Sequence, residues 1–194
     1  NPRITFDELI NTSDNILIST ACVGGILCKG NEEIRDKFLE FIVNNKHRCW
    51  LEIQPHNFPL QKRYNQYLYT LSQQYDLKVI ATNDVHAVDK NAMIGRSIEQ
   101  KAHKIEFHDE DECDLTWKTY EEMIKAFDEQ SCLPKEFYTE ALNETNNLAD
   151  MIEPYELDYS KKYPRYDNSE QEFKRRIVQG IKERGINKLP NFKT

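Results

Sequence analysis

The stretch KVIATNDVHAV (Lys78–Val88) places a short apolar run directly before an Asp and a His. After Lys78 the run is continuously apolar, as in strands that are covered on both faces within a parallel sheet. The run ends at Thr82, and Asp84 and His86 follow with one residue between them. In α/β proteins, sites form at the carboxyl ends of strands and in the loops that follow them. This stretch therefore predicts a parallel sheet with a site at its carboxyl edge.

Two similar segments precede this stretch. NILIST (Asn15–Thr20) is an apolar strand with Cys22 just beyond it, and CWLEIQ (Cys49–Gln54) is a second strand with His56 just beyond it. Apolar residues at helical spacing fill the intervals between the strands, which predicts helices over residues 31–45 and 60–75. Strand–helix alternation with short connections implies right-handed βαβ units. We therefore predict an α/β fold for this part of the chain.

Beyond about residue 88 the pattern becomes helical. The spacing of apolar residues predicts helices over 91–102, 119–127, 134–152 and 169–185. Three pairs have the spacing of a capping box, which marks a helix start: Thr5–Glu8, Thr119–Glu122 and Ser169–Glu172. An acid-rich polar loop and a connector with scattered Pro and Tyr separate these helices, at residues 103–114 and 153–167. An α/β half is thus expected to precede an α-helical half.

The bulk composition is that of an ordinary globular protein. The chain has 194 residues, enough for one domain with an appended piece, and its net charge of −7 argues against a generic nucleic-acid coat. Its five Cys show no C-x-x-C pair, so we expect neither a disulfide framework nor a zinc ribbon, and a reducing cytoplasm is the natural setting. No apolar run is long enough for a membrane span, so no membrane partner is expected. A start at Asn1 instead of Met suggests a processed or excised piece, although a lost initiator Met or a trimmed tag would look similar.

The D-x-H pair is the strongest candidate for chemistry. Alternation along an extended chain would point Asp84 and His86 the same way, so that a carboxylate and an imidazole share one ion. That donor set suits Zn²⁺ or Mn²⁺ better than Mg²⁺ or Ca²⁺, which prefer oxygen shells. The alternative is an Asp that caps the next turn and a His near the surface. Cys22 is either a third ligand, a nucleophile or a small buried hydrophobe.

Other polar residues are weaker candidates for a functional site. Glu52 lies within the second strand, where a buried carboxylate with structural partners is the plainer interpretation. The acid run Asp109–Asp114 could bind a divalent cation weakly, but a solvated mobile loop is the simpler alternative. The last helix carries three successive basic residues that could contact nucleic-acid phosphates or form a solvated face: Lys174, Arg175 and Arg176.

Several segments together resemble a known family. ILISTACVGGIL, WLEIQPHN and VIATNDVHAV resemble, in this order, the second half of the PHP (polymerase and histidinol phosphatase) domain. More narrowly, they resemble the PHP domain at the front of bacterial replicative DNA polymerases of family C, the polymerase III alpha subunits. TYEEMIKAF, EALNETNNLADMIE and EQEFKRRIVQGIKERG are similar to the helices that lead from that domain towards the palm. The resemblance covers nearly the whole chain.

This resemblance implies an architecture and a set of site residues. The chain would supply the later strands of a distorted PHP-type (β/α)7 barrel, followed by an α-helical segment. Residues 1–105 would be the carboxyl-terminal part of the barrel, 106–155 a helical extension, and 156–194 a connector and basic helix leading to the palm. Cys22, Asp84 and His86 fall on metal-ligand positions of the family, whereas Glu52 and His56 match its strand pattern as surroundings of the site.

The chain also departs from the family pattern. The opening H-x-H of PHP domains does not occur in these 194 residues, nor do the palm carboxylates that transfer nucleotides. The metal site, for Zn or Mn with Mg as a further option, would thus be incomplete in this chain. A barrel with only its later strands would expose a strand edge. The implied partners are the amino-terminal PHP half, the palm, DNA and other replisome subunits.

The implied activities are DNA synthesis by the parent polymerase and metal-dependent 3′–5′ exonuclease cleavage at the PHP site. Two alternatives stay open. One is a stand-alone PHP phosphoesterase acting on a small phosphate monoester, which leaves the helical tail unexplained. The other is a degenerate scaffold without catalysis.

Overall fold

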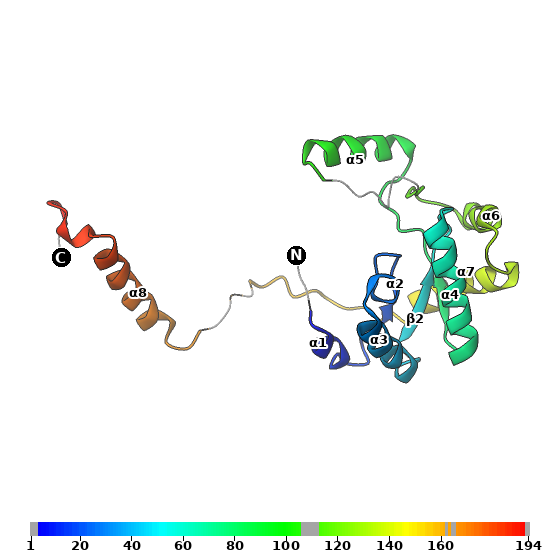
Figure 1. The fold of residues 1–194 in the computed structure, drawn as a ribbon, viewed down its shortest axis with the longest axis horizontal. Coiled ribbons are helices and arrows are strands. Elements are labelled where there is room, and N and C mark those ends of the chain that lie inside the picture. Colours follow the sequence, from blue (N-terminus) through cyan, green and yellow to red (C-terminus); the bar gives the residue numbers. More distant parts are fainter. Residues whose placement is uncertain (1–3, 106–112, 162, 164–165, 193–194) are drawn as a thin grey trace. The chain divides into compact units, whose positions relative to one another are not determined.

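The computed structural model describes residues 4–105, 113–161, 163 and 166–192 of the chain. Two units pack separately, Asn1–Glu153 and Pro154–Thr194. The first unit holds the whole of the described sheet and the helices around it (Figure 1). His108 and most of the acid run from Asp109 lie outside the described residues.

A parallel sheet forms the centre of the first unit, as the strand–helix alternation predicts. Its strands are β1 (Ile18–Ser19), β2 (Cys49–Ile53) and β3 (Val79–Ala81), side by side in that order. Ile18 pairs with Cys49, and Leu51 pairs with Val79. The predicted α/β class is confirmed as a mixed fold with a three-stranded parallel sheet.

The first strand is shorter than the predicted span Asn15–Thr20. Within that span, the carbonyl oxygen of Ile16 accepts from the Arg48 guanidinium Nη1 at 3.4 Å and not from a neighbouring strand. The backbone N–H of Ile18 donates to the carbonyl of Arg48, just before β2, and that of Thr20 donates to the carbonyl of Trp50 within β2.

One face of the sheet carries the main apolar core. Cys49, Leu51 and Ile53 of β2 alternate onto this face and are fully buried. The core residues Phe41 and Leu68 come from two covering helices, α3 (Glu32–Asn44) and α4 (Pro59–Tyr75). A short helix, α2 (Ile26–Lys29), completes the turn after β1.

The carboxyl-terminal helices of the first unit are α6 (Tyr120–Gln130) and α7 (Lys135–Asp150). Helix α7 packs along β3, and α6 packs on α7. The Thr145 hydroxyl of α7 accepts from the Ala81 N–H and donates to the Ala81 carbonyl, both at 3.2 Å. These Ala81 groups face away from β2, so α7 covers the edge of the sheet at β3.

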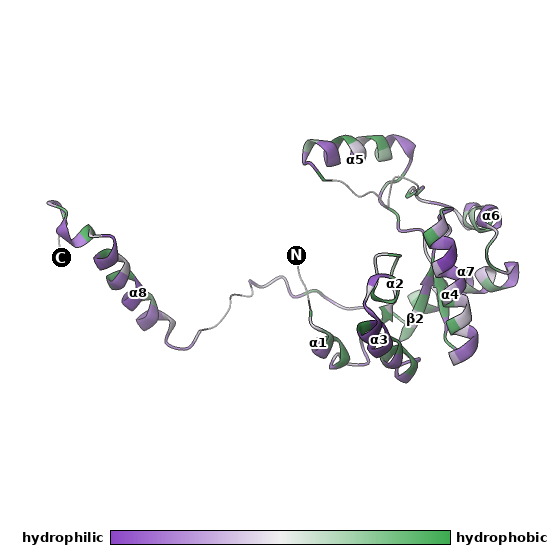
Figure 2. Ribbon diagram, in the orientation of Figure 1, coloured by the Kyte–Doolittle hydropathy of each residue, from purple (hydrophilic) through white to green (hydrophobic). Residues whose placement is uncertain are grey.

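Three further helices are α1 (Phe6–Ile10) and α5 (Lys90–Ala102) in the first unit and α8 (Ser169–Glu183) in the second. A 3₁₀ turn, Ile186–Lys188, follows α8. Within the part of the chain that the structure describes, α5 and α8 bury no residue completely, and α8 alternates hydrophilic and hydrophobic positions (Figure 2). No helix of the described residues is long and apolar enough to cross a membrane.

Two of the three predicted capping boxes are confirmed, and the third is wrong. Thr5 with Glu8 and Thr119 with Glu122 form both reciprocal bonds. In the second unit, Asn168 occupies the N-cap of α8 in a left-handed conformation, and no side-chain cap forms there among the described residues. The carboxylate of Glu172 is instead bonded to Arg175 and Arg176.

Candidate functional site

Asp84 and His86 lie together beyond the carboxyl end of β3. The distance from Asp84 Oδ1 to His86 Nε2 is 3.2 Å, and the side chains are 43% and 32% exposed, so solvent ions can reach both. Their meeting does not come from strand alternation, because β3 ends at Ala81 and Asp84 has φ 51° in the left-handed region. An Asp tolerates this conformation better than most residues, since its short side chain bonds locally.

Backbone bonds from a distant segment hold the His in place. The N–H groups of His86 and Ala87 both donate to the carbonyl of Leu115, at 2.9 Å and 3.3 Å. The backbone N–H of Trp117 donates to the Ala87 carbonyl at 2.9 Å, and Ala87 forms a parallel β-bridge with Thr116. The imidazole is therefore carried on an anchored backbone, although it follows a turn.

Cys22 follows β1 and is half-buried, with its Sγ accepting a bond from the Gly24 N–H at 3.4 Å. The turn needs Gly25, because a Cβ there would come within 2.4 Å of the Thr20 carbonyl oxygen. No group of three or more His, Cys, Asp or Glu side chains gathers closely enough to hold a metal among the described residues. Cys22 therefore does not complete a three-ligand group with Asp84 and His86 in this part of the chain.

Glu52 ties the three strands together on the second face of the sheet. Its carboxylate accepts from the Ser19 hydroxyl of β1 at 2.5 Å and from the Thr82 hydroxyl after β3 at 2.6 Å. Its own N–H donates to the Thr20 hydroxyl at 2.9 Å. Both carboxylate oxygens are occupied by hydroxyl donors, which is a structural arrangement beside the Asp84–His86 pair.

His56 is buried beyond β2, with only 6% of its surface exposed. Its carbonyl accepts from Gln130 Nε2 at 2.8 Å, whereas its ring Nε2 is buried without a hydrogen-bond partner among the described residues. Burial lowers the pKa of His56 to about 4, and the negative charge of Asp84 opposes that shift only in part. The ring is neutral at pH 7.

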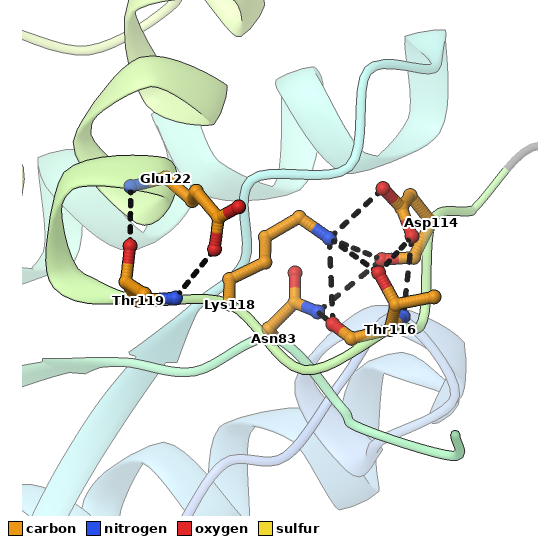
Figure 3. A network of polar contacts seen from close by, with 6 residues as sticks. All are labelled: Asn83, Asp114, Thr116, Lys118, Thr119 and Glu122. Carbon is orange, nitrogen blue, oxygen red and sulfur yellow. Dashed lines mark hydrogen bonds and ion pairs between the residues drawn. The ribbon is translucent and has the colours of Figure 1, made fainter. Parts of the chain in front are cut away.

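A second polar network lies next to these residues, and sequence reasoning did not find it (Figure 3). The Asn83 amide donates to the carbonyl oxygens of Asp114 at 3.2 Å and Thr116 at 2.7 Å. Lys118 Nζ lies 3.0 Å from both the Asp114 carboxylate and its carbonyl. Burial would raise the pKa of Asp114, but hydrogen bonds from Thr116 and Lys118 lower it below its usual value. Asp114, the last residue of the acid run, is thus held by these bonds although its side chain is 57% exposed.

The basic residues of α8 are already paired along their own helix. Lys174 Nζ lies 2.7 Å from the Glu170 carboxylate. The Glu172 carboxylate forms ion pairs with both Arg175, at 2.6 Å, and Arg176, at 2.8 Å. Hydrogen bonds from the two arginines lower the pKa of Glu172 to about 2. Phosphate contact by Lys174, Arg175 and Arg176 stays a prediction, and it would require these exposed pairs to exchange partners.

We expect the burial of neutral His56 to make stability depend on pH. The unfolded imidazole, with a pKa near 6.5, binds a proton more readily than the folded one. The stabilisation is therefore complete above about pH 6.5 and is lost as the pH falls towards 4, by at most about 3 kcal/mol. Urea unfolding at pH 4.5 and 7 measures this loss of stability. A smaller pH dependence is expected for His56→Gln than for His47→Gln at an exposed position, and equal dependences would contradict this origin.

Comparison with known proteins places the chain in context. No family model matches it. DNA polymerase III subunit alpha of Borreliella burgdorferi is 27% identical over 167 residues, which cover 81% of this chain and 14% of that protein. The alpha subunits of Aquifex aeolicus and Thermus aquaticus are each 31% identical, over 44% and 46% of this chain and 8% of their own length. The chain thus spans a small share of these relatives, and it is related to a part of the alpha subunit of DNA polymerase III.

Proposed function

We propose that this chain is part of a replicative DNA polymerase of family C and forms an accessory α/β module of the PHP type. The similarity to three alpha subunits supports this proposal, as does the parallel βαβ arrangement. In this view the three strands continue into a (β/α)7 barrel formed with an amino-terminal PHP half. Nucleotide transfer belongs to palm residues elsewhere in the polymerase. DNA and replisome subunits are the partners, and the cytoplasm is the setting.

We further propose that the carboxyl edge of the sheet holds a divalent metal, Zn or Mn, with Mg as a further option. The observation that carries this is the convergence of Asp84 and His86 at 3.2 Å, both accessible, just beyond β3. A carboxylate and an imidazole suit these ions, but two ligands fill only part of a coordination shell. The amino-terminal PHP half would supply the rest, and Cys22 would join them only once that half is in place.

Such a metal would supply an activated water for phosphodiester hydrolysis, the chemistry of a 3′–5′ exonuclease. The residues of this chain have a simpler part in the proposal. Asp84 and His86 bind and orient the ion. The Leu115 carbonyl fixes the His86 backbone, and the occupied carboxylate of Glu52 holds the three strand ends together.

The experiment is metal content by mass spectrometry on purified chain equilibrated with Zn²⁺ or Mn²⁺. About one ion per chain is expected, with loss in Asp84→Asn and in His86→Ala because each removes one of few ligands. His103→Ala, an exposed His at the end of α5, is the matched control and is expected to retain the ion. Retention of metal by both Asp84 and His86 variants would contradict the proposed site.

A second candidate function is a structural module without catalysis. It is favoured by the lack of any three-residue His, Cys, Asp or Glu group in the described ranges. The same measurement separates the two, because a scaffold is expected to bind no stoichiometric metal even at saturating concentrations.

A further inference from the structure

Helix α5 presents its isoleucine side chains to solvent. Ile94 and Ile98, one turn apart, are 60% and 63% exposed. The half-buried positions of this helix point away from the isoleucines, and most of them are polar or small: Ala92, Met93, Arg96, Ser97 and Gln100. A helix of a globular protein normally buries its apolar stripe and exposes its polar side. The orientation of α5 is therefore the reverse of the usual one.

Both ends of α5 are nevertheless well defined. The Asp89 carboxylate caps the first turn by accepting from the Ala92 N–H at 2.8 Å. At the other end Lys104 has φ 56°, in the left-handed region, and the Ile105 N–H donates to the Gln100 carbonyl at 2.9 Å. This is the bond of a Schellman motif, a common helix terminator. The two exposed isoleucines thus belong to a formed helix with both ends capped.

Caps alone do not account for the stability of α5. A helix of 13 residues is marginal in water, and most helices in proteins are stabilised by packing of an apolar face. Within the described ranges, α5 buries no side chain fully and packs extensively on no other helix or strand. The isoleucines are therefore without a packing partner in this part of the chain.

Lysines flank the isoleucines on the same side of the helix. Four residues at intervals of 4, 4 and 3 share this side, which we call the Ile–Lys face: Lys90, Ile94, Ile98 and Lys101. The two lysines are exposed and form no ion pair with a described residue. The nearest carboxylates in the sequence do not join the face, because Asp89 is engaged as the N-cap and Glu99 lies on the other side of α5. The face is thus apolar and positively charged, on a chain whose net charge is −7.

This composition restricts what can cover the face. Burial of two isoleucines requires an apolar surface, and the lysines beside them require acidic side chains at its rim. A second copy of this chain would bring the same lysines together, since the Ile–Lys face carries no carboxylate. A phosphate surface would leave the isoleucines without apolar contact. A polypeptide surface remains, and the relatives are much longer than this chain, which matches 14% of one and 8% of the other two.

We propose that the Ile–Lys face of α5 docks on an acid-rimmed apolar surface in the part of the polymerase polypeptide that lies outside these 194 residues. The proposal rests on the polymerase membership proposed above. It also has a consequence for the candidate metal site. Helix α5 begins at Lys90, shortly after His86, so docking of α5 would restrain the turn that carries Asp84 and His86 from its carboxyl side.

Photo-crosslinking in the full polymerase tests the proposal. The variants are Ile98→benzoylphenylalanine and Glu99→benzoylphenylalanine, at two neighbouring exposed positions of which only the first lies on the Ile–Lys face. The Ile98 variant is expected to crosslink to acidic segments outside the 194 residues, and the Glu99 variant is expected to give few such products. Crosslinks of the Ile98 variant only within the 194 residues, only to a second copy, or equal to those of the Glu99 variant would overturn the proposal.

Hydrogen exchange of the α5 amides gives an independent measure. These amides are expected to exchange about ten-fold more slowly, or slower still, in the full polymerase than in the 194-residue chain, because docking opposes opening of the helix. Ile98→Gln and Lys101→Glu are expected to lose this protection, whereas Glu99→Gln is expected to keep it. Equal exchange in the chain and in the polymerase, or equal effects of Ile98→Gln and Glu99→Gln, would overturn the docking.

The two proposals fail in different ways. A gene that encodes no longer polypeptide would contradict the polymerase membership and this inference together. A full polymerase in which α5 gains no protection and Ile98 gives no specific crosslink would contradict this inference alone.

Discussion

Replacing Phe127 by Ala is expected to lower the free energy of unfolding of the first unit by about 3–5 kcal/mol. Phe127 lies on the inner face of α6 and is 1% exposed. Its ring stacks on Tyr138 of α7, with centroids 5.0 Å apart, and belongs to the same apolar core as Leu51 of β2. The substitution leaves a cavity where α6, α7 and the sheet meet, and the loss of contacts adds to the loss of apolar burial.

Urea unfolding followed by circular dichroism measures this change. Tyr120→Ala on the same helix is the control, because Tyr120 is 46% exposed and a surface substitution changes stability by about 0.5 kcal/mol or less. A similar small change for Phe127→Ala would mean that α6 is not an integral part of the folded unit.

Replacing Gln130 by Leu is expected to cost about 1–3 kcal/mol, although it substitutes a similar volume of apolar side chain. Gln130 is 1% exposed, and its amide nitrogen donates to the carbonyl oxygens of Gln54 at 2.9 Å and His56 at 2.8 Å. Its oxygen accepts from Asn65 Nδ2 at 2.9 Å. Leu leaves the His56 carbonyl without its partner, at a cost of about 1–3 kcal/mol, whereas the Gln54 carbonyl and the Asn65 amide still bond each other at 2.8 Å.

The variant is also expected to loosen the segment after β2 that carries His56. Hydrogen exchange at the amides of Gln54, His56 and Asn57 measures this directly, with faster exchange in Gln130→Leu than in Gln66→Leu, an exposed position on α4. Equal exchange and equal stability in the two variants would show that the buried amides are dispensable.

The sequence predicted the order and type of the elements because their signals are local. Apolar runs at Leu51 and Val79, apolar spacing in α3 and α4, and the capping box at Thr119 each depend on residues within a few positions. Interactions between distant segments escaped the same reasoning. Gln61 and Asn65 are fully buried on α4, where the apolar spacing predicts only that a helix forms.

Hydrogen bonds between buried polar side chains explain this burial. Asn65 is buried because it bonds the Gln54 carbonyl at 2.8 Å and Gln130 at 2.9 Å, and those partners lie 11 and 65 residues away in the sequence. A pattern of apolar residues contains no sign of such pairing. The helix predicted over 134–152 ends earlier, at Asp150, and Ile152 beyond it is 54% exposed.

At the candidate site, too, the sequence predicted what depends on neighbouring residues and missed what depends on distant ones. Sequence position alone identified Asp84, His86 and His56 as residues beyond strand ends, and the structure places all three there. It did not identify Asn83, whose role depends on Thr116, 33 residues away. It also gave the wrong backbone for Asp84, because a left-handed turn leaves no periodic signal in the sequence.

The central claim is that a divalent ion binds at the carboxyl end of β3 through Asp84 and His86. The most direct test is paramagnetic broadening of backbone amide signals by substoichiometric Mn²⁺. The account predicts that broadening begins at residues 84–87 and reaches Leu115–Trp117, whose backbone bonds to that turn. Broadening centred instead on the acidic first turn of α6 or α8, or spread evenly over the exposed carboxylates, would contradict it.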